Sequence, residues 1–201
     1  MTKKTADKYK ITSIQQLQDP EIAKLFDSDR DGKANLVGCN PGWGCESIID
    51  EHLKTYGLED TVEHNKGQYT VLLADAITRY KQGQAIIYYA YNPHWISTVL
   101  KPGEDVVWLS VDGKNLGFSG SKQQIVANKT FLEANPVAKR WFELVQIPVA
   151  DMNTESLRIK NGEDKPEDIL RHAQEWVKNN QQKYDSWLEI ARQEASSTIN
   201  N

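Results

Sequence analysis

The feature that most constrains the fold is an uncharged, strand-favouring run, AIIYYAY, at residues 85–91. Continuous runs of this kind are typical of strands that are buried on both faces of a parallel sheet. The run follows a stretch with helical periodicity, QYTVLLADAITRYKQG at residues 68–83, which Lys81 and Gly83 are well placed to end. Because strands that alternate with helices form βαβ units, the chain is predicted to be an α/β protein with a mostly parallel sheet.

Other segments extend this alternation on both sides of the run. Ser13 and Asp19 are suited to cap two short helical turns near the amino end. The apolar spacing at residues 45–57 predicts a further helix. Strands are expected at residues 60–64, 105–111 and 123–129, and helices from Pro93 onward and at residues 130–146 with an interruption at Pro136.

The pattern changes along the chain. A polar start at residues 1–9 precedes the alternating strands and helices, and from about Asp151 onward the chain is predicted to be a helical, highly charged tail. The tail contains no predicted strand against which its helices could pack. It is therefore either a separate helical subdomain or packs against something that this chain does not contain.

The charge and hydropathy of the chain argue against several classes of function. The net charge of -4 and the isoelectric point near 5.6 offer no general attraction to nucleic acids or anionic membranes. Every apolar run falls well short of the roughly 18 residues that span a bilayer. The amino end, MTKKTADKYK, is not a secretory signal as written. The protein is thus either cytoplasmic or has its signal outside this sequence.

Both cysteines lie in one short stretch, GCNPGWGCES, as Cys39 and Cys45. Two cysteines alone cannot supply the four ligands of a structural zinc site. Their spacing also differs from the C-x-x-C motif of thiol redox proteins. Two interpretations are left: two free thiols, or a small disulfide loop whose sharp turn the surrounding glycines and Pro41 would provide. A disulfide would hold the amides of Gly44 and Cys45 rigid at the start of the next helix and would indicate an oxidising compartment.

Two aromatic side chains are candidates for ligand contacts. Trp43 precedes a predicted helix start, where exposed N–H groups attract carboxylates, so this site suits a ligand with a cation at one end and a carboxylate at the other. Tyr91 ends the buried strand at the carboxyl edge of the sheet, where ligands bind in open α/β sheets. The alternative is structural in both cases: Trp43 as an ordinary core or turn residue, and Tyr91 as core packing together with Tyr88, Tyr89 and Trp95.

The sequence contains no complete motif for a metal site, a cofactor or catalysis. DSDRDGKAN, at residues 27–35, has carboxylates at the offsets of a calcium loop, but Gly38 stands where the bidentate glutamate is required. The two interpretations are a weak or partial calcium site and a solvated Asx turn, of which the Asx turn is preferred. The chain has no G-x-S-x-G, P-loop or H-E-x-x-H motif, and its histidines lie beside no obvious nucleophile. We therefore expect neither an enzyme nor a resident cofactor.

Several stretches taken together resemble a known family. GCNPGWGCE, LADAITRYKQG, YYAYNPHW, LKPGEDVVWL, IVANK and IPVADMN occur in this order, within a match that runs from about Asp7 to near Trp187. They look like the periplasmic glycine betaine/proline betaine-binding proteins of osmoprotectant ABC transporters. The resemblance implies a type II-like periplasmic-binding-protein fold, in which two α/β lobes close on the ligand across a hinge. It also implies that the ligand is delivered to a membrane permease.

The same resemblance implies roles for individual residues. Trp43 matches a tryptophan of the aromatic box that holds the quaternary ammonium group of the ligand by cation–π attraction. The amides of Gly44 and Cys45 match the donors that bind the ligand carboxylate, and Cys39–Cys45 matches a short disulfide. Tyr91 stands where close relatives have a second box tryptophan, so affinity or ligand choice is expected to differ.

The resemblance covers only part of the family's length. The part of the family that precedes the match carries the signal, most of the first lobe and further ligand contacts. We therefore expect a periplasmic protein with one complete lobe at residues 10–146 and a tail at residues 147–201 that belongs to the other lobe. The expected partners are the permease and either a missing amino-terminal lobe or a second copy of the chain. The alternative to a betaine-binding component is a truncated, non-binding interaction domain that retains the fold.

Overall fold

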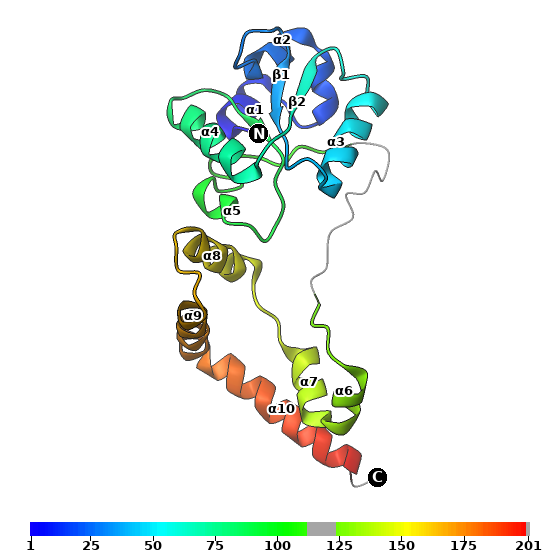
Figure 1. Ribbon diagram of the computed structural model, residues 1–201, viewed down its shortest axis with the longest axis vertical. Helices are drawn as coiled ribbons and strands as arrows, with labels where there is room; N and C mark the ends of the chain where they lie inside the picture. Colours follow the sequence, from blue (N-terminus) through cyan, green and yellow to red (C-terminus); the bar gives the residue numbers. More distant parts are fainter. Residues whose placement is uncertain (112–123, 200–201) are drawn as a thin grey trace. The chain divides into compact units, whose positions relative to one another are not determined.

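The computed structural model describes residues 1–111 and 124–199, with side chains as far as residue 193. The chain packs as two compact units, Met1–Ser119 and Gly120–Asn201 (Figure 1). Among the described residues, all the strands lie in the first unit. The α/β character predicted from the sequence is therefore carried by the first unit.

The first unit is built on a three-stranded parallel sheet. β1 (Ala34–Val37) lies at the centre, between β2 (Val62–Asn65) and β3 (Ile87–Tyr88). Leu36 of β1 pairs with a residue of each neighbouring strand. Because the three strands run the same way, their carboxyl ends meet at one edge of the sheet. This arrangement confirms the parallel α/β sheet that the sequence predicts.

A helix follows each strand at the carboxyl edge of the sheet. α3 (Gly44–Thr55) follows β1, α4 (Tyr69–Lys81) connects β2 to β3, and α5 (Ile96–Val99) follows β3 (Figure 1). α3 and α4 match helices predicted from apolar spacing, and Gly83, with a φ of +81°, lies just beyond the end of α4 as expected. α5 is a single short turn rather than the longer helix expected after Pro93.

The core of the first unit joins the sheet to its helices. α4 contributes Tyr69, Leu73 and Ala76, which share one face at three- and four-residue spacing. Burial of apolar side chains is the main favourable term in folding, so this face fixes where α4 begins relative to the sheet. Other fully buried side chains of the unit complete the core: Leu17, Phe26, Val37, Leu58, Ile86 and Ile96.

The amino-terminal residues belong to this core. Met1 and Thr2 are buried, and the backbone N–H of Thr2 donates to the carbonyl of Ile86 at 3.0 Å. α1 (Lys3–Tyr9) follows at once. The segment expected to be a separate polar stretch at residues 1–9 therefore packs as part of the first unit.

Three short helical elements lead from α1 to the sheet. They are η1 (Ile14–Gln18), α2 (Pro20–Ala23) and η2 (Lys24–Phe26), of which η1 and η2 are 3-10 helices. Ser13 accepts a hydrogen bond at the start of η1, and Asp19 does so at the start of α2. Both caps are those that the sequence predicts.

Two strands predicted in the first unit differ from the structure: one is shorter than predicted, and the other is not a strand. The run at 85–91 contributes only Ile87–Tyr88 to the sheet, and residues 105–111 form isolated bridges rather than a strand. The backbone N–H of Val107 donates to the carbonyl of Met1 at 2.9 Å, and a similar bond joins Ser110 to Thr12 at 2.8 Å. These backbone groups are thus satisfied by the amino-terminal segment, which takes the place of a neighbouring strand.

The strand predicted at residues 123–129 is also wrong. Residues 124–128 form no strand, and Gln123 lies outside the described residues. The side chain of Asn128 accepts a hydrogen bond from the backbone N–H of Phe131 at 3.1 Å. A helix cap therefore ends the extended stretch where the β-favouring run IVA had suggested a strand.

Among its described residues, the second unit has helices as its only regular secondary structure. Pro136 stands at the start of a helix, at the interruption that the sequence predicts. The glycine-rich stretch at residues 112–121, which separates the two predicted strands at 105–111 and 123–129, lies outside the described residues. The helices are α6 (Lys129–Ala134), α7 (Pro136–Leu144), α8 (Val149–Lys160), α9 (Pro166–Asn179) and α10 (Gln181–Ile199).

The helices of the second unit pack through aromatic side chains. Trp141 of α7 meets Tyr184 of α10 edge to face, with ring centroids 6.0 Å apart. Trp176 of α9 stacks on Trp187 of α10 at 6.3 Å. α7, which we expected in the α/β lobe, thus packs with α10 of the tail. The division of the two lobes at residue 146 stays a prediction.

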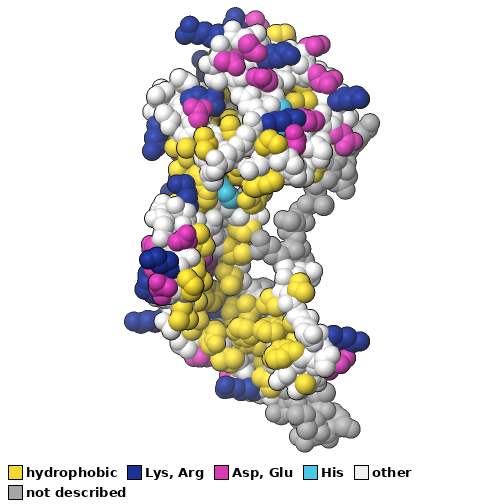
Figure 2. Space-filling model, viewed as in Figure 1, with side chains coloured by type: hydrophobic (Ala, Val, Ile, Leu, Met, Phe, Trp, Pro, Cys, Tyr) yellow, Lys and Arg dark blue, Asp and Glu magenta, His cyan; other side chains and the backbone are white. Residues whose placement is uncertain are grey.

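Hydrophobic side chains gather on the face of the second unit that Figure 2 shows. Apolar patches of this kind often mark surfaces that meet another protein or a further part of the same protein. Large hydrophobic residues of this unit that are exposed include Ile125, Val126, Phe131, Val137, Ile147, Val149, Ile159, Ile169 and Leu170.

Candidate ligand-binding site

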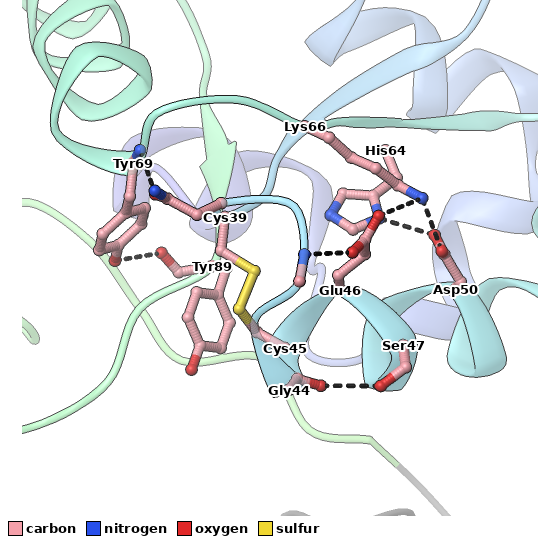
Figure 3. The surroundings of a disulfide bond; sticks show 12 residues. Cys39, Gly44, Cys45, Glu46, Ser47, Asp50, His64, Lys66, Tyr69 and Tyr89 are labelled. Atoms are coloured by element: carbon pink, nitrogen blue, oxygen red, sulfur yellow. Dashed lines mark hydrogen bonds and ion pairs between the residues drawn. A yellow bond between two sulfur atoms is a disulfide. The ribbon is translucent and has the colours of Figure 1, made fainter.

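The loop between β1 and α3 is closed by a disulfide bond between Cys39 and Cys45, whose Cα atoms lie 6.5 Å apart (Figure 3). From the sequence, either a disulfide or two free thiols was possible. The structure has the disulfide. Gly42 has a φ of +85°, a left-handed conformation that favours glycine. The backbone N–H of Trp43 donates to the carbonyl of Asn40 at 3.1 Å, which completes a tight turn inside the bridged loop.

A carboxylate fastens this turn to α3. Glu46 accepts a hydrogen bond from the backbone N–H of Gly42 at 2.7 Å, and the same side chain lies 3.2 Å from the ammonium of Lys66 (Figure 3). These contacts, first the Gly42 bond and then Lys66, hold the pKa of Glu46 below its usual value. Lys66 also pairs with Asp50 at 2.7 Å, and Asp50 in turn bonds to Nδ1 of His64 at 2.7 Å. These ion pairs therefore stabilise the loop on the side opposite the rings of Tyr69 and Tyr89 (Figure 3).

Gly38, which directly precedes the disulfide loop, lies where there is no room for a side chain. A Cβ at Gly38 would collide with the ring of His64 and would lie 2.9 Å from the carbonyl oxygen of Asn65. Nε2 of His64 is buried there without a hydrogen-bond partner in the described part of the chain. The close approach of β1 and β2 at this point sets the path by which the chain enters the disulfide loop.

Trp43 occupies the N-cap position of α3, and its side chain makes no capping hydrogen bond. The amides of Gly44 and Cys45 are the first two of a twelve-residue helix, where backbone N–H groups lack partners within the helix. The hydroxyl of Ser47 donates to the carbonyl of Gly44 at 3.1 Å, a bond that involves neither amide. The helix start therefore offers donors beside an indole ring, as the sequence predicts.

Trp43 and Tyr91 both lie against the ring of Tyr69. The Trp43 ring centroid is 5.8 Å from that of Tyr69, and Tyr91 stacks on Tyr69 at 6.1 Å with an interplanar angle of 23°. Tyr89 joins the group at 6.0 Å from both tyrosines. Trp43 is 44% exposed and Tyr91 38%, whereas Tyr69 is 2% exposed. Neither candidate is a core residue, and the structure brings them to the same buried ring.

Tyr69, which the sequence analysis missed, ties the elements of this cluster together. Its hydroxyl donates to the carbonyl of Tyr89 at 2.9 Å, and its backbone N–H donates to the side chain of Asn40 in the disulfide loop at 2.7 Å (Figure 3). Burial raises the pKa of Tyr69, so the phenol stays neutral. The sequence signals a helix start close to Tyr69, but the nearness of this start to Trp43 and Tyr91 becomes evident only in the fold.

His94 is the other member of the cluster that sequence reasoning did not assign. Its ring centroid lies 4.9 Å from that of Tyr91 and 5.3 Å from that of Tyr69. The side chain is buried, and its Nδ1 accepts a hydrogen bond from the backbone N–H of Ile96 at 3.3 Å. Burial lowers the pKa of His94.

The acidic loop at residues 27–35 forms the Asx turn that we preferred. The carboxylate of Asp27 accepts backbone N–H bonds from Arg30 at 2.6 Å and Gly32 at 2.9 Å. The carboxylates of Asp27, Asp29 and Asp31 lie within 4.8 Å of one another. The loop's own amides thus supply the hydrogen bonds of an Asx turn, and a weak or partial calcium site at these carboxylates stays a prediction.

No helix among the described residues combines the length and the apolar character needed to cross a membrane.

Comparison with known proteins points to one family. A family model described as the substrate binding domain of the ABC-type glycine betaine transport system matches residues 1–179. The chain is 47% identical to the glycine betaine-binding periplasmic protein OusX of Dickeya dadantii. It is 48% identical to the glycine betaine/proline betaine-binding periplasmic protein of Escherichia coli. Each match covers 94% of this chain and 62% of the relative, so the chain spans less than two thirds of the length of these relatives.

Solved structures share the fold over part of their length. Lactococcal OpuAC, in its closed-liganded conformation complexed with glycine betaine, matches with a TM-score of 0.57 and 22% identity over 89% of this chain and 62% of that chain. A glycine betaine, L-proline-binding protein (ProX) from Borrelia burgdorferi matches with a TM-score of 0.56 and 20% identity, over 88% of this chain and 61% of that chain. At these identities the likeness concerns the fold alone.

Proposed function

The chain belongs to the family of substrate-binding domains of ABC-type glycine betaine transport systems, and from this premise we propose that its first unit binds glycine betaine or a related quaternary ammonium osmoprotectant. The observation that carries the proposal is the arrangement of Trp43 and Tyr91. Both rings are partly exposed around buried Tyr69, and Trp43 directly precedes the first amides of α3. The ligand residues are Trp43, Tyr91 and the backbone of Gly44 and Cys45.

The cationic end of the ligand would lie against the open ring faces. A quaternary ammonium cannot donate hydrogen bonds, so it gains most from an aromatic face, where each ring contributes roughly 0.5–2 kcal/mol. Trp43 and Tyr91 present such faces, and both are backed by Tyr69. Burial raises the pKa values of Tyr69 and Tyr91, so these rings carry no charge at neutral pH.

The carboxylate end would lie at the start of α3. Backbone N–H groups at a helix start, together with the helix dipole, favour an anion there. The Cys39–Cys45 bridge and the bond from Gly42 to Glu46 hold this start in place before any ligand arrives. Because the loop is already ordered, less conformational entropy is lost when the ligand binds.

The wider role that we propose is delivery of this ligand to the permease of an ABC transporter in the periplasm, without catalysis. The exposed apolar surface of the second unit supports one further part of this proposal. We assign that surface to contact with the other lobe, which corresponds to the part of the relatives that this chain does not span. A second copy of the chain is the alternative partner.

The proposal is tested by isothermal titration calorimetry of this chain with glycine betaine in the low millimolar range. Saturable binding with one ligand per chain is the expected result, which would mean that the first unit holds a working half-site. Absence of heat, with a chain shown to be folded by circular dichroism, would instead support the alternative, a non-binding interaction domain that retains the fold.

A further inference from the structure

We propose that Lys66 is a positioning residue of the ligand site: it holds the carboxylate of Glu46 on Gly42 and offsets its charge, so that the first amides of α3 are kept for the carboxylate of a ligand. The inference rests on the proposed function, because it names a determinant of the same site. Lys66 lies in the connection between β2 and α4, outside the residues assigned to ligand contact. It therefore acts on the ligand through Glu46.

The connection between β2 and α4 is bonded to the disulfide loop. The backbone N–H of Gly67 donates to the carbonyl of Cys39 at 3.2 Å. The neighbouring Lys66 lies beside the first turns of α3, where its ammonium is 3.2 Å from Glu46 and 2.7 Å from Asp50 (Figure 3). Hydrogen bonds to these carboxylates, first to Asp50 and then to Glu46, raise the pKa of Lys66, so this side chain is a cation at neutral pH.

Glu46 is a rival of the ligand for the helix start. It is the third residue of α3, and a carboxylate at this position commonly reaches back to backbone N–H groups at the start of a helix. Its Oε2 accepts from the N–H of Gly42 at 2.7 Å, and its Oε1 lies 3.2 Å from the ammonium of Lys66. Both carboxylate oxygens thus have partners other than the amides of Gly44 and Cys45.

The charge of Glu46 acts on a zwitterionic ligand in two opposing ways. It repels a carboxylate at the start of α3, which lies roughly 10 Å away, because the nitrogens of Gly42 and Gly44 are at most about 7 Å apart. It attracts the cationic end of the same ligand. That end is placed against the rings on the opposite side of the loop, so the attraction acts over a longer distance (Figure 3). Repulsion therefore exceeds attraction, and the charge of Lys66 reduces this excess.

The expected effect is small, since it is a difference between two opposing interactions. At an effective dielectric constant of about 20, loss of the Lys66 charge weakens binding about threefold. The side chains of Lys66 and Glu46 are both partly exposed, so added salt should screen the effect.

The test is the affinity of the whole chain for glycine betaine, measured by calorimetry in dilute buffer and in about 1 M NaCl, with circular dichroism to confirm the fold. Lys66→Met keeps most of the side-chain length and removes the charge. Glu46→Gln removes the opposing charge and keeps an oxygen that accepts from Gly42. The two changes are made singly and together. Lys101→Met is the matched control, because Lys101 pairs with Glu104 at 3.4 Å elsewhere in the first unit.

Lys66→Met is expected to bind about threefold more weakly than the wild type, and the double variant is expected to regain the wild-type affinity. The loss in Lys66→Met should shrink in about 1 M salt, where the Debye length is about 3 Å. Lys101→Met should bind as the wild type does. A purely structural ion pair would behave differently, because removal of its second partner would not restore binding.

Three results would overturn the inference and leave the proposed function intact. They are an unchanged affinity in Lys66→Met, a double variant as weak as Lys66→Met, and an equal loss in Lys101→Met. No binding by the wild type would instead refute the proposed function, and the inference with it. Should Lys66→Met fail to fold, Lys66→Gln takes its place with the same expectations.

Discussion

His94 in the first unit and His172 in the second are both almost fully buried, yet their surroundings shift their pKa values in opposite directions. His94 lies among rings and accepts a backbone hydrogen bond, and desolvation favours its neutral form. His172 lies between two carboxylates: its Nδ1 is 2.9 Å from Glu155 and its Nε2 is 2.9 Å from Glu163. Both nitrogens must carry protons to donate to both partners, so His172 is an imidazolium.

The difference shows that burial alone does not fix the charge of a side chain. Around His172, hydrogen bonds to Glu155 and then to Glu163 raise the pKa above its ordinary value despite desolvation. Arg171 and His172 together lower the pKa of Glu163 to about 2. The α8–α9 hairpin is thus held by paired charges, whereas the aromatic cluster of the first unit is kept free of charge next to a proposed cation site.

The largest effect is expected from Trp43→Ala. This change tests the contrast between the two units, because it removes a ring that is proposed to bind the ligand and that contributes little to stability. Because Trp43 is 44% exposed, the change costs little packing but removes one cation–π face. We expect the affinity for glycine betaine to fall at least about tenfold, roughly 1.4 kcal/mol, by calorimetry. Trp108→Ala is the control, because Trp108 is also exposed and lies outside the ring contacts of the cluster. An affinity unchanged in Trp43→Ala would remove Trp43 from the site.

His172→Gln is expected to act in the opposite way, on stability and not on binding. A group with a raised pKa adds stability that is fully present below its unfolded value of 6.5 and is lost as the pH rises through its folded value, which lies above 6.5. The melting temperature of His172→Gln should therefore lie further below that of the wild type at pH 5.5 than at pH 9.5.

Thermal unfolding followed by circular dichroism measures this gap. Lys129→Gln is the control, because Lys129 and Glu133 form an exposed pair 3.8 Å apart that contributes little to stability. A gap of equal size at both pH values would show that His172 is neutral in the folded chain, and the contrast with His94 would fail.

A smaller effect is expected from Tyr69→Phe, which keeps the ring and removes the bond to the carbonyl of Tyr89. A hydrogen bond of this kind contributes about 1 kcal/mol, and its loss lets Tyr89 and the strand end move relative to α4. We expect calorimetry to show about threefold weaker binding of glycine betaine. Tyr80→Phe is the matched control: it removes a hydroxyl bond to Asp105 in the same unit and should lower stability without changing affinity. Equal affinities for both variants would confine Tyr69 to a packing role.

Local patterns were enough to predict much of the first unit and one helix boundary in the second. The apolar spacing of α3 and α4, the caps at Ser13 and Asp19, and the break at Pro136 depend on neighbours in the sequence, and the structure confirms them. The turn residues around Trp43 likewise brought both cysteines within reach of each other. Such features are determined within a few residues, where sequence alone is informative.

Features that depend on distant partners could not be predicted in this way. Residues 105–111 have the composition of a strand, but their backbone partners are Met1, Thr2 and Thr12, near the other end of the unit. The place of Tyr69 in the site follows from where α4 begins relative to two strands, which no local pattern reports. For His94, the sequence shows a histidine and the fold decides its charge.

The smallest expected effect is a gain, from Tyr91→Trp. Tryptophan offers a stronger cation–π face than tyrosine, and at 38% exposure the Tyr91 site leaves room for a larger ring on its open side. The stack on Tyr69 at 6.1 Å would orient the indole toward Trp43. We expect glycine betaine to bind about threefold more tightly, roughly 0.6 kcal/mol by calorimetry. Tyr9→Trp on α1, a tyrosine of equal exposure outside the cluster, should change nothing. Weaker binding by Tyr91→Trp would mean that the pocket is shaped around the smaller ring, and that the ligand it fits best is bulkier at its cationic end than glycine betaine.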